Sequence, residues 1–288
     1  MFFAQLIRGT LNAMNDDAAN LKPILFFLLA EDGIFELMEI WSVLHRQSVG
    51  FDLVLLDQTG GKTKLPPPIR KAALKTVAVG PEGLGGIINA ISAEMKNDLL
   101  VFTSDRVFPT HDHWIQRLCE PILSGRAVAV FGRVIPAPGG NYFLNNDIEK
   151  SFPPNPSKVD VSGFSMDNCA VKGGLLLQKP FPEGALRDPA AVWRASNGIA
   201  AEYCPSAIVQ RYTLLTIGGI YRESRSKGED MSVVRDGPSL FAVFGEIVGG
   251  IWRDVVFALS IKKPQYLWFP FLYRFAVHFG YYLGTRKK

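Results

Sequence analysis

Cysteine is scarce in this sequence. Only three cysteines occur among 288 residues, Cys119, Cys169 and Cys204, an odd number at wide spacing. Neither a disulfide framework nor a zinc cluster is indicated, and a reducing cytoplasm fits best. Because 48% of the residues are hydrophobic and 20% are charged, the chain can bury a full core as one large domain or as a domain with an appendage.

Long apolar segments are missing as well. The N-terminal region lacks a basic start followed by a long apolar stretch, and Asp16 and Asp17 interrupt it, so no signal peptide is predicted. Residues 1–22 are instead expected to form an N-terminal extension. In the aromatic C-terminal region, the uncharged run 264–273 contains two prolines. It is far short of the roughly 20 apolar residues that a bilayer-spanning helix needs.

Positive charge and aromatic rings gather near the C-terminus. Residues 239–288 hold seven lysines and arginines against two acidic residues, and 13 of the 33 aromatic residues. Aromatic rings with interspersed cations suit the headgroup layer of an anionic membrane, where each basic residue contributes roughly 1 kcal/mol. The pattern predicts a helical tail at 239–288 that lies on a membrane surface without spanning it. The alternative is that these aromatic residues pack onto the main domain as ordinary helices.

Strand and helix patterns alternate in the first part of the chain. Continuous apolar runs of strand length are typical of strands that are covered on both faces. This alternation predicts an α/β fold with a mostly parallel sheet flanked by helices, and such sheets bind ligands beyond the carboxyl ends of their strands. Asp57 and Asp105 both follow strand ends. The expected strands are 23–30, 51–56, 76–79 and 99–103, and the expected helices are 34–47 and 83–95.

Several short motifs follow one another along the chain. Asp57 stands in LLDQTGG, Asn89 lies in a glycine-led helix, and Asp105 lies in VFTSDRVFPTHDHWIQRL. FGRVIP and FPEG come next, Asp188 follows shortly after, and a helix through 192–195 that Gly198 could end precedes a strand in EYCPSAIV. Near the C-terminus the sequence reads YRFAVHFGYYLG. Together these motifs resemble the inverting GT-A glycosyltransferases of family 2, and within them the bacterial rhamnosyltransferase-like group that builds surface polysaccharides.

The resemblance, which runs from about residue 23 to residue 228, implies a GT-A (Rossmann-like) domain at 23–238. It implies that Asp57 contacts the base and ribose of a nucleotide sugar, that Asn89 and Asp105 also belong to the donor site, and that Asp188 is the catalytic base. A divalent cation, Mg²⁺ or Mn²⁺, would bind at Asp105. Asn168 and Lys172 are candidates for contacts with the acceptor.

The partners follow from the same resemblance. They are a nucleotide-sugar donor, with dTDP-rhamnose suggested by the subgroup, and a glycan or polyprenyl-linked acceptor. The implied location is peripheral, at the cytoplasmic face of the inner (plasma) membrane.

The chemistry of inverting transfer explains these residue types. A carboxylate must take the proton of the attacking hydroxyl, and a positive charge must stabilise the departing diphosphate. Here the sequence departs from the family pattern. Thr103 replaces the first aspartate of the metal motif, Arg106 follows Asp105, and the family's Glu-Asp pair reads Arg187-Asp188. The segment 207–215, where relatives carry a metal-binding histidine, has none.

Arginine offers a physical substitute for the cation, because its planar fork binds phosphate oxygens and stays charged. We therefore expect weak metal dependence, with arginines stabilising the leaving group. The candidates are Arg106, Arg187, Arg211, Arg222 and Arg225, of which Arg106, Arg222 and Arg225 are assigned to the donor site. The rival hypothesis is a degenerate, non-catalytic glycosyltransferase fold that binds a partner or a nucleotide sugar without turnover.

Each carboxylate also has a structural alternative. Asp57 could be a turn aspartate, Asp105 a loop carboxylate paired with Arg106, and Asp188 a cap on the helix that Pro189 begins. Other classes of function fit less well. No helix-turn-helix, RNA-recognition or zinc pattern accompanies the basic tail, so no nucleic acid partner is expected. A nucleotidyltransferase would need a glycine- and lysine-rich phosphate loop near the first strand, where the sequence reads LLAEDGIF.

Overall fold

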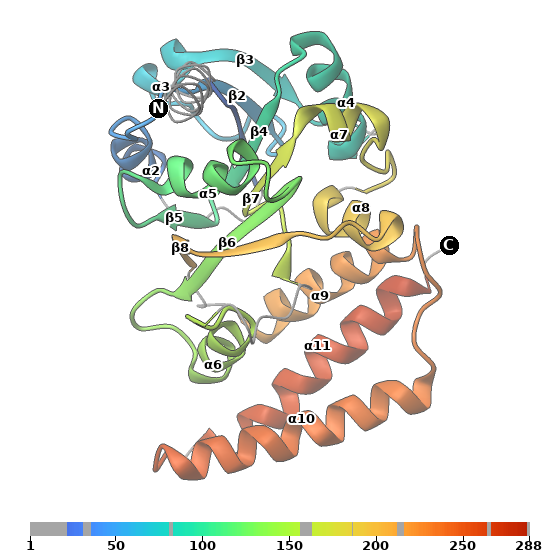
Figure 1. Ribbon diagram of the computed structural model, residues 1–288. Helices are drawn as coiled ribbons and strands as arrows, with labels where there is room; N and C mark the ends of the chain where they lie inside the picture. The colour runs from blue at the N-terminus through green and yellow to red at the C-terminus, as the bar shows by residue number, and fades with distance from the viewer. Residues whose placement is uncertain are drawn as a thin grey trace, which may run out of the picture.

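A computed structural model of the chain describes residues 22–30, 36–80, 83–155, 163–185, 187–211, 216–263 and 266–286. The expected N-terminal extension lies, except for Lys22, outside the described residues. The described part forms an eight-stranded sheet with helices on both faces and two long helices below it (Figure 1). The strand order is β3-β2-β1-β4-β7-β6-β8-β5.

The first four strands form a parallel half-sheet. β1 pairs in parallel with β2 and β4, and β2 pairs in parallel with β3. All six residues of β1 are buried, and alternate residues point to opposite faces, where they join two separate hydrophobic clusters. The uninterrupted apolar run therefore reflects a strand covered on both sides, as expected from its sequence. The strands are β1 (Ile24–Leu29), β2 (Asp52–Asp57), β3 (Ala73–Ala78) and β4 (Leu99–Ser104).

The second half of the sheet is mixed. β7 runs antiparallel to both β4 and β6, β6 and β8 are parallel, and β5 pairs antiparallel with β8. The half formed by β3, β2, β1 and β4 is parallel throughout, and with the parallel pair of β6 and β8 the sheet is mostly parallel, as its sequence predicted. The strands are β5 (Val107–Pro109), β6 (Ala129–Pro136), β7 (Asn168–Lys172) and β8 (Glu202–Arg211).

Helices cover the two faces of the sheet. Buried residues of α4, α7 and α8 join one hydrophobic cluster, and those of α2, α3 and α5 join the other. Gly198 ends α8 in the left-handed conformation at φ 60°, which glycine adopts without strain and which confirms its expected role. These helices are α2 (Leu37–Leu44), α3 (Pro67–Ala72), α4 (Gly83–Met95), α5 (Trp114–Leu123), α7 (Gly173–Gln178) and α8 (Pro189–Asn197).

Two details differ from the expected elements. The third strand begins at Ala73, three residues earlier than predicted. Its start was not visible in the sequence, because the strand residues alternate between half-buried and exposed and lack a continuous apolar run. The helix α3 was not among the expected elements; it begins within the proline run at 66–68, with proline in its first turn. Proline suits this place because its missing N–H would have no partner there.

The C-terminal region is helical and packs beneath the sheet. The helix α11 lies between α9 and α10 (Figure 1). A third hydrophobic cluster joins Phe143 and Ile220 to Ala258, Tyr273 and Ala276. The helices are α6 (Tyr142–Ser151), α9 (Ile217–Met231), α10 (Leu240–Ser260) and α11 (Phe269–Thr285).

A buried arginine of α11 links this helix to α10 and α6. Arg274 of α11 donates to both oxygens of Asp254 in α10, each at 2.7 Å, and to Asp147 of α6 at 2.9 Å. Tyr273 adds a hydrogen bond of 2.6 Å to the second oxygen of Asp147. Arg274 therefore holds both long helices to α6, and its charge is internal and does not face solvent.

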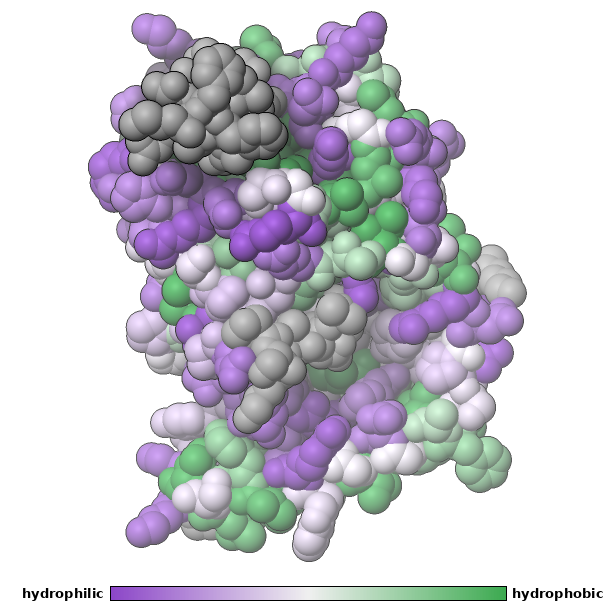
Figure 2. Space-filling view, viewed as in Figure 1, coloured by the Kyte–Doolittle hydropathy of each residue, from purple (hydrophilic) through white to green (hydrophobic). Residues whose placement is uncertain are grey.

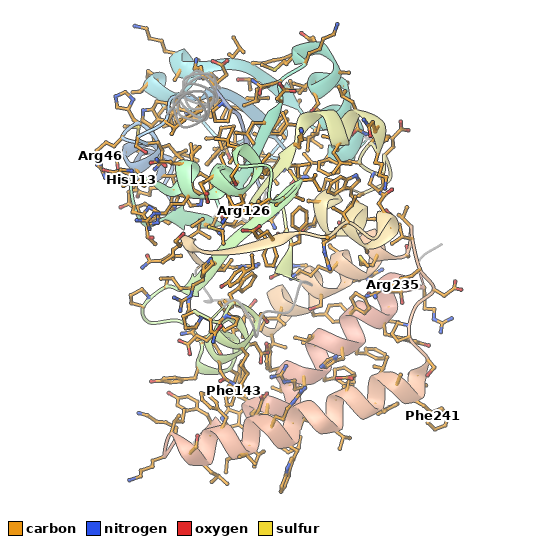
Figure 3. The ribbon with its side chains drawn as sticks, viewed as in Figure 1. Arg46, His113, Arg126, Phe143, Arg235 and Phe241 are labelled. Atoms are coloured by element: carbon orange, nitrogen blue, oxygen red, sulfur yellow. The ribbon has the colours of Figure 1, made fainter. Side chains whose placement is uncertain are left out.

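The two long helices expose many apolar side chains. Their positions on α10 recur every three or four residues and so lie along one side of the helix. Phe241 is 92% exposed and projects away from the body of the protein (Figure 3), and hydrophobic residues lie beside hydrophilic ones in the lower part of the surface (Figure 2). We call this surface the outer apolar face; it consists of Phe241, Phe244, Val248, Trp252, Val256, Leu259, Trp268, Phe271, Leu272 and Phe275.

Some of the aromatic residues thus pack against the rest of the protein and others are exposed, so the packing alternative holds for part of the region and membrane contact stays a prediction. Among the described residues, no helix is long and apolar enough to cross a membrane.

Candidate functional site

Asp105 lies at the carboxyl end of β4, directly after six buried strand residues. Its backbone N–H donates to the carbonyl of Leu28 at 3.1 Å, and its carboxylate oxygen accepts from the N–H of Ala30 at 3.0 Å. The side chain is only 4% exposed. Asp105 is therefore fixed at the edge of the sheet where β1 and β4 both end.

Asp57 lies at the same edge, at the end of β2. It pairs in register with Leu29, the last residue of β1. Its carboxylate accepts from the N–H and hydroxyl of Thr59, at 2.7 and 2.6 Å, and from the N–H of Gly61 at 3.0 Å. Two strand spacings separate the ends of β2 and β4, about 10 Å. Both aspartates thus lie at one edge of the sheet, and Asp57 also shapes the turn that follows it.

A third carboxylate, Asp167, lies beside the end of β4. The hydroxyl of Ser104 donates to its Oδ1 at 2.6 Å, and the hydroxyl of Thr103 donates to its backbone carbonyl at 3.1 Å. Burial alone would raise the pKa of Asp167, but Arg106, Arg211 and the Ser104 hydrogen bond outweigh it and lower that pKa. Thr103, at the first position of the expected metal motif, therefore supports Asp167 through its hydroxyl.

Glu223 of α9 completes a cluster of alternating charges. Its Oε1 lies 2.7 Å from Nη2 of Arg211 and 2.9 Å from Nζ of Lys227, and Nη1 of Arg211 lies 3.8 Å from Oδ2 of Asp167. Burial opposes ionisation of Glu223, but Lys227 and Arg211, with a smaller effect of Arg106, hold its pKa well below the usual range. The guanidinium groups thus lie among carboxylates at the carboxyl edge of the sheet.

Asp188 is the N-cap of α8. Its Oδ1 accepts from the N–H of Ala191 at 3.2 Å, as a cap does, and from the N–H of Met166 at 3.1 Å. Burial, and then the negative charge of Asp167, raise the pKa of Asp188 to about 6. A carboxyl group with that pKa exchanges its proton near neutral pH, which is what a general base requires. The capping and base roles predicted from the sequence are compatible in this geometry.

Asp230 holds the segment that carries Asp188. This aspartate of α9 is 4% exposed, and its Oδ2 accepts from the backbone N–H groups of Arg187 and Asp188 at 3.2 and 2.9 Å. Both bonds join the same side-chain oxygen to consecutive main-chain N–H groups, those of Arg187 and of Asp188 itself. Asp230 is therefore a positioning residue for Asp188.

Three predicted residues have other surroundings. The amide of Asn89 exchanges hydrogen bonds of 2.8 and 2.9 Å with the main chain of Phe181, which ties α4 to the segment before α8. The amide of Asn168 is 3% exposed and accepts from Trp114 at 2.9 Å while donating to two backbone carbonyls. These hydrogen bonds give both asparagines a structural role. The contacts predicted for Asn89 with the donor and for Asn168 with the acceptor stay predictions.

Lys172 lies away from the cluster. In the register of β7 and β4, Asn168 pairs with Thr103 whereas Lys172 pairs with Leu99, at the opposite end of β4 from Asp105. The structure therefore does not bring Lys172 to the edge of the sheet that carries the carboxylates.

The arginines divide into two groups. Arg106 and Arg211 act electrostatically on Asp167 and Glu223, so their charges lie within the cluster. Arg225, in contrast, pairs with Glu229 one helical turn away at 3.2 Å, and Arg222 is exposed on α9. Of the arginines assigned to the donor site, the structure brings Arg106 next to the carboxylates most directly.

The residues around Asp105 fit a protein-held divalent cation poorly. Asp167, the carboxylate beside Asp105 along the sheet edge, is engaged by Ser104 and faced by the cationic Arg211 and Arg106. Within the described ranges, no group of three histidine, cysteine, aspartate or glutamate side chains could hold a metal ion. The positively charged Arg106 and Arg211 therefore lie where a cation at Asp105 would need further ligands.

The sequence did not single out Asp167, Glu223, Lys227 or Asp230. Asp167 stands directly before Asn168, the first residue of β7, and this position at a strand start was its one signal in the sequence. Glu223, Lys227 and Asp230 lie in YRESRSKGED, which reads as an ordinary solvated helix. Their partners are distant in sequence, so no local pattern marks them.

No protein-family model matches the sequence, and no curated protein matches it either. Solved structures do share its architecture. The mannosyltransferase PcManGT from Pyrobaculum calidifontis, in complex with GDP-Man and Mn²⁺, is similar with a TM-score of 0.54 at 13% identity, covering 93% of this chain and 88% of that chain. Glucosyl-3-phosphoglycerate synthase from Mycobacterium tuberculosis, in complex with Mn²⁺, UDP-glucose and phosphoglyceric acid, gives 0.50 at 15% identity, covering 75% and 79%.

A third structure, S. aureus TarS, is longer. The likeness covers 72% of this chain but only 39% of TarS, with a TM-score of 0.48 at 12% identity. The first two structures establish the class of fold. The protein has the GT-A glycosyltransferase fold, as its sequence predicted.

Proposed function

We propose that the protein is an inverting glycosyltransferase that moves a sugar from a nucleotide-sugar donor to a glycan or polyprenyl-linked acceptor in surface polysaccharide synthesis. The observation that carries the proposal is Asp188, a carboxyl group with a pKa of about 6 held beside a charged cluster at the carboxyl edge of a GT-A sheet. Ligands bind at this edge in open α/β sheets. The complexes of PcManGT with GDP-Man and of the synthase with UDP-glucose agree with a nucleotide-sugar donor.

In the proposed reaction, an acceptor hydroxyl oxygen attacks the anomeric carbon and its proton passes to the carboxylate of Asp188. The bond between that carbon and the diphosphate oxygen breaks, and the nucleoside diphosphate departs with the bonding electrons. Arg106 and Arg211 supply fixed positive charge for the departing group, since an arginine has five donors and need not leave its carboxylate partners to bind a phosphate oxygen. Asp57 and Asp105 would contact the donor. By resemblance to the rhamnosyltransferase-like group, the transferred sugar is rhamnose from dTDP-rhamnose.

The experiment follows nucleotide release and thermal stabilisation with a panel of nucleotide sugars. We expect one donor to stabilise the protein and to release its nucleotide, with Asp188→Asn abolishing release and keeping stabilisation. Asp112→Asn, which changes a surface carboxylate that is 45% exposed, is the matched control. Stabilisation without release, unchanged by Asp188→Asn, would instead favour the non-catalytic alternative.

Weak metal dependence is the second part of the proposal. Mn²⁺ in both neighbouring complexes points toward a cation, whereas the paired arginines in this chain point away from one. We expect release to persist in the presence of a chelator. Release that disappears with chelator and returns with Mn²⁺ or Mg²⁺ would reject the arginine mechanism and leave the transferase assignment standing.

The outer apolar face supports a peripheral place on the cytoplasmic side of the plasma membrane. Trp252 is 69% exposed, and the exposed cations Arg253 and Lys262 lie on the same helix or just after it. Apolar rings flanked by cations suit an anionic bilayer surface. Arg274 adds nothing to this attraction because its charge is paired inside the protein.

Co-sedimentation with phosphatidylcholine vesicles, with and without phosphatidylglycerol, tests this part. We expect binding that depends on the anionic lipid and falls several-fold in the double variant Phe241→Ser, Trp252→Ser. Leu74→Ser is the matched control, since Leu74 is an exposed apolar residue of β3 far from this face. Equal sedimentation of all three proteins would refute membrane binding through the outer apolar face.

A further inference from the structure

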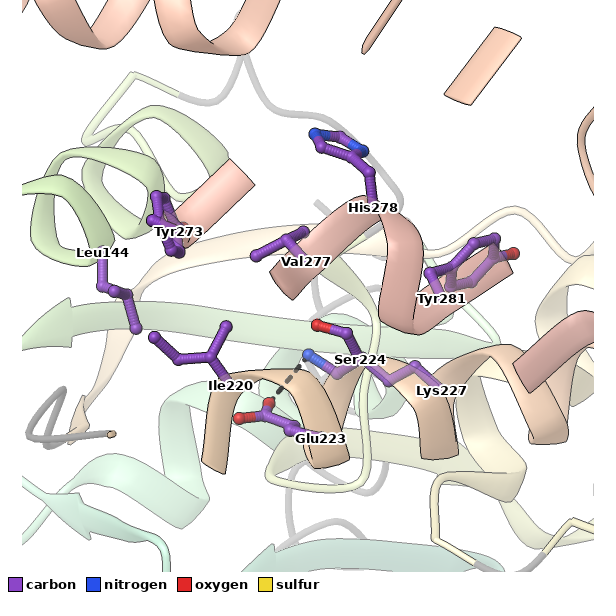
Figure 4. Close-up of a pocket in the computed structure, with 9 residues that line it drawn as sticks. All are labelled: Leu144, Ile220, Glu223, Ser224, Lys227, Tyr273, Val277, His278 and Tyr281. Atoms are coloured by element: carbon purple, nitrogen blue, oxygen red, sulfur yellow. Dashed lines mark ion pairs between the residues drawn. The ribbon is translucent and has the colours of Figure 1, made fainter. Parts of the chain in front are cut away.

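A pocket of about 390 Å³ lies between α9, α11 and α6 (Figure 4). Its volume falls in the range of small-molecule sites, which combine apolar walls with a few convergent polar groups. None of the residues assigned to donor or base from the sequence lines it. The lining residues are Leu144, Ile220, Glu223, Ser224, Lys227, Tyr273, Val277, His278 and Tyr281.

One side of the pocket is polar and carries balanced charge. The dashed line in Figure 4 marks the ion pair between Glu223 and Lys227, 2.9 Å apart, and the side chain of Ser224 lies close by on the same helix. A carboxylate, an ammonium group and a hydroxyl together both accept and donate hydrogen bonds. Because the two charges compensate each other, this side suits the hydroxyl groups of an uncharged head better than a phosphate.

The opposite side is apolar. Leu144 of α6, Ile220 of α9 and Val277 of α11 converge on the space, next to the third hydrophobic cluster to which Ile220 belongs (Figure 4). A ligand that fills both sides must therefore carry a polar head and a hydrocarbon part.

The pocket adjoins the charged cluster. Glu223 lines the pocket and also pairs with Arg211 at 2.7 Å, and Arg211 lies 3.8 Å from Asp167, whose charge raises the pKa of Asp188. On its other side, α11 carries Phe271, Leu272 and Phe275 of the outer apolar face. One helix, about 10 Å across, therefore separates the pocket from that face.

We propose that this pocket binds the acceptor, and that the acceptor is an amphiphile with an uncharged sugar head and a hydrocarbon chain. The proposal rests on the proposed transferase function and names the acceptor class for it. The head lies against Ser224 and the Glu223–Lys227 pair, and the chain lies against Leu144 and Val277.

Calorimetric titration of the full chain with octyl glucoside, below its micelle concentration and without any donor, tests the proposal. We expect saturable binding that weakens at least tenfold in Val277→Trp, which fills the pocket, and severalfold in Ser224→Ala, which removes only a hydroxyl. Val128→Trp is the matched control, because Val128 is exposed just before β6 and away from the pocket. Octyl phosphate should bind more weakly than octyl glucoside.

Two results would overturn the proposal. One is binding that survives in both pocket variants but is lost in the double variant Phe241→Ser, Trp252→Ser, which would assign the amphiphile to the outer apolar face. The other is tighter binding of octyl phosphate, which would assign an anionic head.

Titration without a donor separates this proposal from the transferase proposal. Binding at the pocket together with no nucleotide release from any donor would count against the enzyme alone. Release from a donor together with no binding of octyl glucoside would count against the pocket assignment alone.

Discussion

Arg211 at the end of β8 and Glu223 in α9 form an ion pair with a distance of 2.7 Å between Nη2 and Oε1. The pair joins the last strand residue to the helix beneath the sheet, and Asp167 faces the other side of the same guanidinium. Arg211 thus lies between two carboxylates that belong to different elements. On our proposal, this side chain supplies positive charge for the departing diphosphate.

Replacement of this arginine should destabilise the protein. Arg211→Met removes a positive charge that compensates the carboxylates of Asp167 and Glu223. We expect the free energy of unfolding to fall by about 2–3 kcal/mol, because breaking a partly buried ion pair leaves carboxylates without that partner. Chemical denaturation at neutral pH measures the loss. The double variant Arg211→Met, Glu223→Gln should recover part of it, and a double variant less stable than the sum of the single changes would contradict the pairing.

The pKa of Glu223 gives a pH dependence with a definite sign. Lys227 and Arg211 hold its pKa in the folded protein below the ordinary glutamate value of 4.5. Its contribution to stability is therefore complete above that value and declines as the pH falls below it. We expect Glu223→Gln to be less stable than the wild type near neutral pH, with a smaller further loss of stability between about pH 5 and about pH 3. Urea denaturation across that range measures both quantities, and parallel curves would contradict the prediction.

The fold was predictable from the sequence where a strand or helix carries its own signal. The apolar run of β1 and the glycine that ends α8 mark their elements directly, and α4 was placed with its observed bounds. Asp105 and Asp57 were found because they follow strands. The contact between Arg211 and Glu223 could not be predicted from the sequence, since α9 has the sequence of a solvated helix and only the tertiary fold turns Glu223 toward β8. The same holds for Asp230.

The pKa of Asp188 predicts how activity depends on pH. Because burial and the charge of Asp167 raise this pKa to about 6, the base is ionised, and able to accept a proton, only above that value. Nucleotide release should rise as the pH passes through about 6 and level off above it. A rate profile with no inflection in that range would count against Asp188 as the base.

Stability should move in the opposite direction to activity when Asp188 is replaced. A raised carboxyl pKa means that the folded state resists ionisation, so stability conferred by the protonated form declines as the pH rises from 3.8 through about 6. Asp188→Asn removes this cost and keeps a good helix cap. We expect an inactive protein that is at least as stable as the wild type at neutral pH, by thermal denaturation. Loss of both activity and stability would indicate a structural role alone.

Asp230 should affect catalysis through position. Asp230→Ala leaves the N–H groups of Arg187 and Asp188 without their shared acceptor, a loss of about 1–3 kcal/mol in stability. We expect kcat to fall with little change in donor KM, since the residues proposed to contact the donor, Asp57 and Asp105, are on other elements. Asp230→Asn keeps an acceptor oxygen and should restore much of the rate. Equal losses of kcat in both variants would contradict a positioning role.

Arg274 should hold the two long helices to the rest of the protein. It is the common partner of Asp254 in α10 and Asp147 in α6, with side-chain exposure of only 8%. Arg274→Met leaves the buried carboxylate of Asp254 without its counter-charge, and we expect a loss of about 3–5 kcal/mol. Because α10 depends on this contact, proteolysis at 239–263 should become faster than elsewhere in the chain.

The triple variant Arg274→Met, Asp254→Leu, Asp147→Asn is the control, because it removes the paired charges together. It should recover stability if the loss in Arg274→Met comes from unpaired charge, and should not if the loss comes from a smaller side chain. Uniform acceleration of cleavage along the whole chain would show that Arg274 stabilises the global fold, with no particular role in attaching α10.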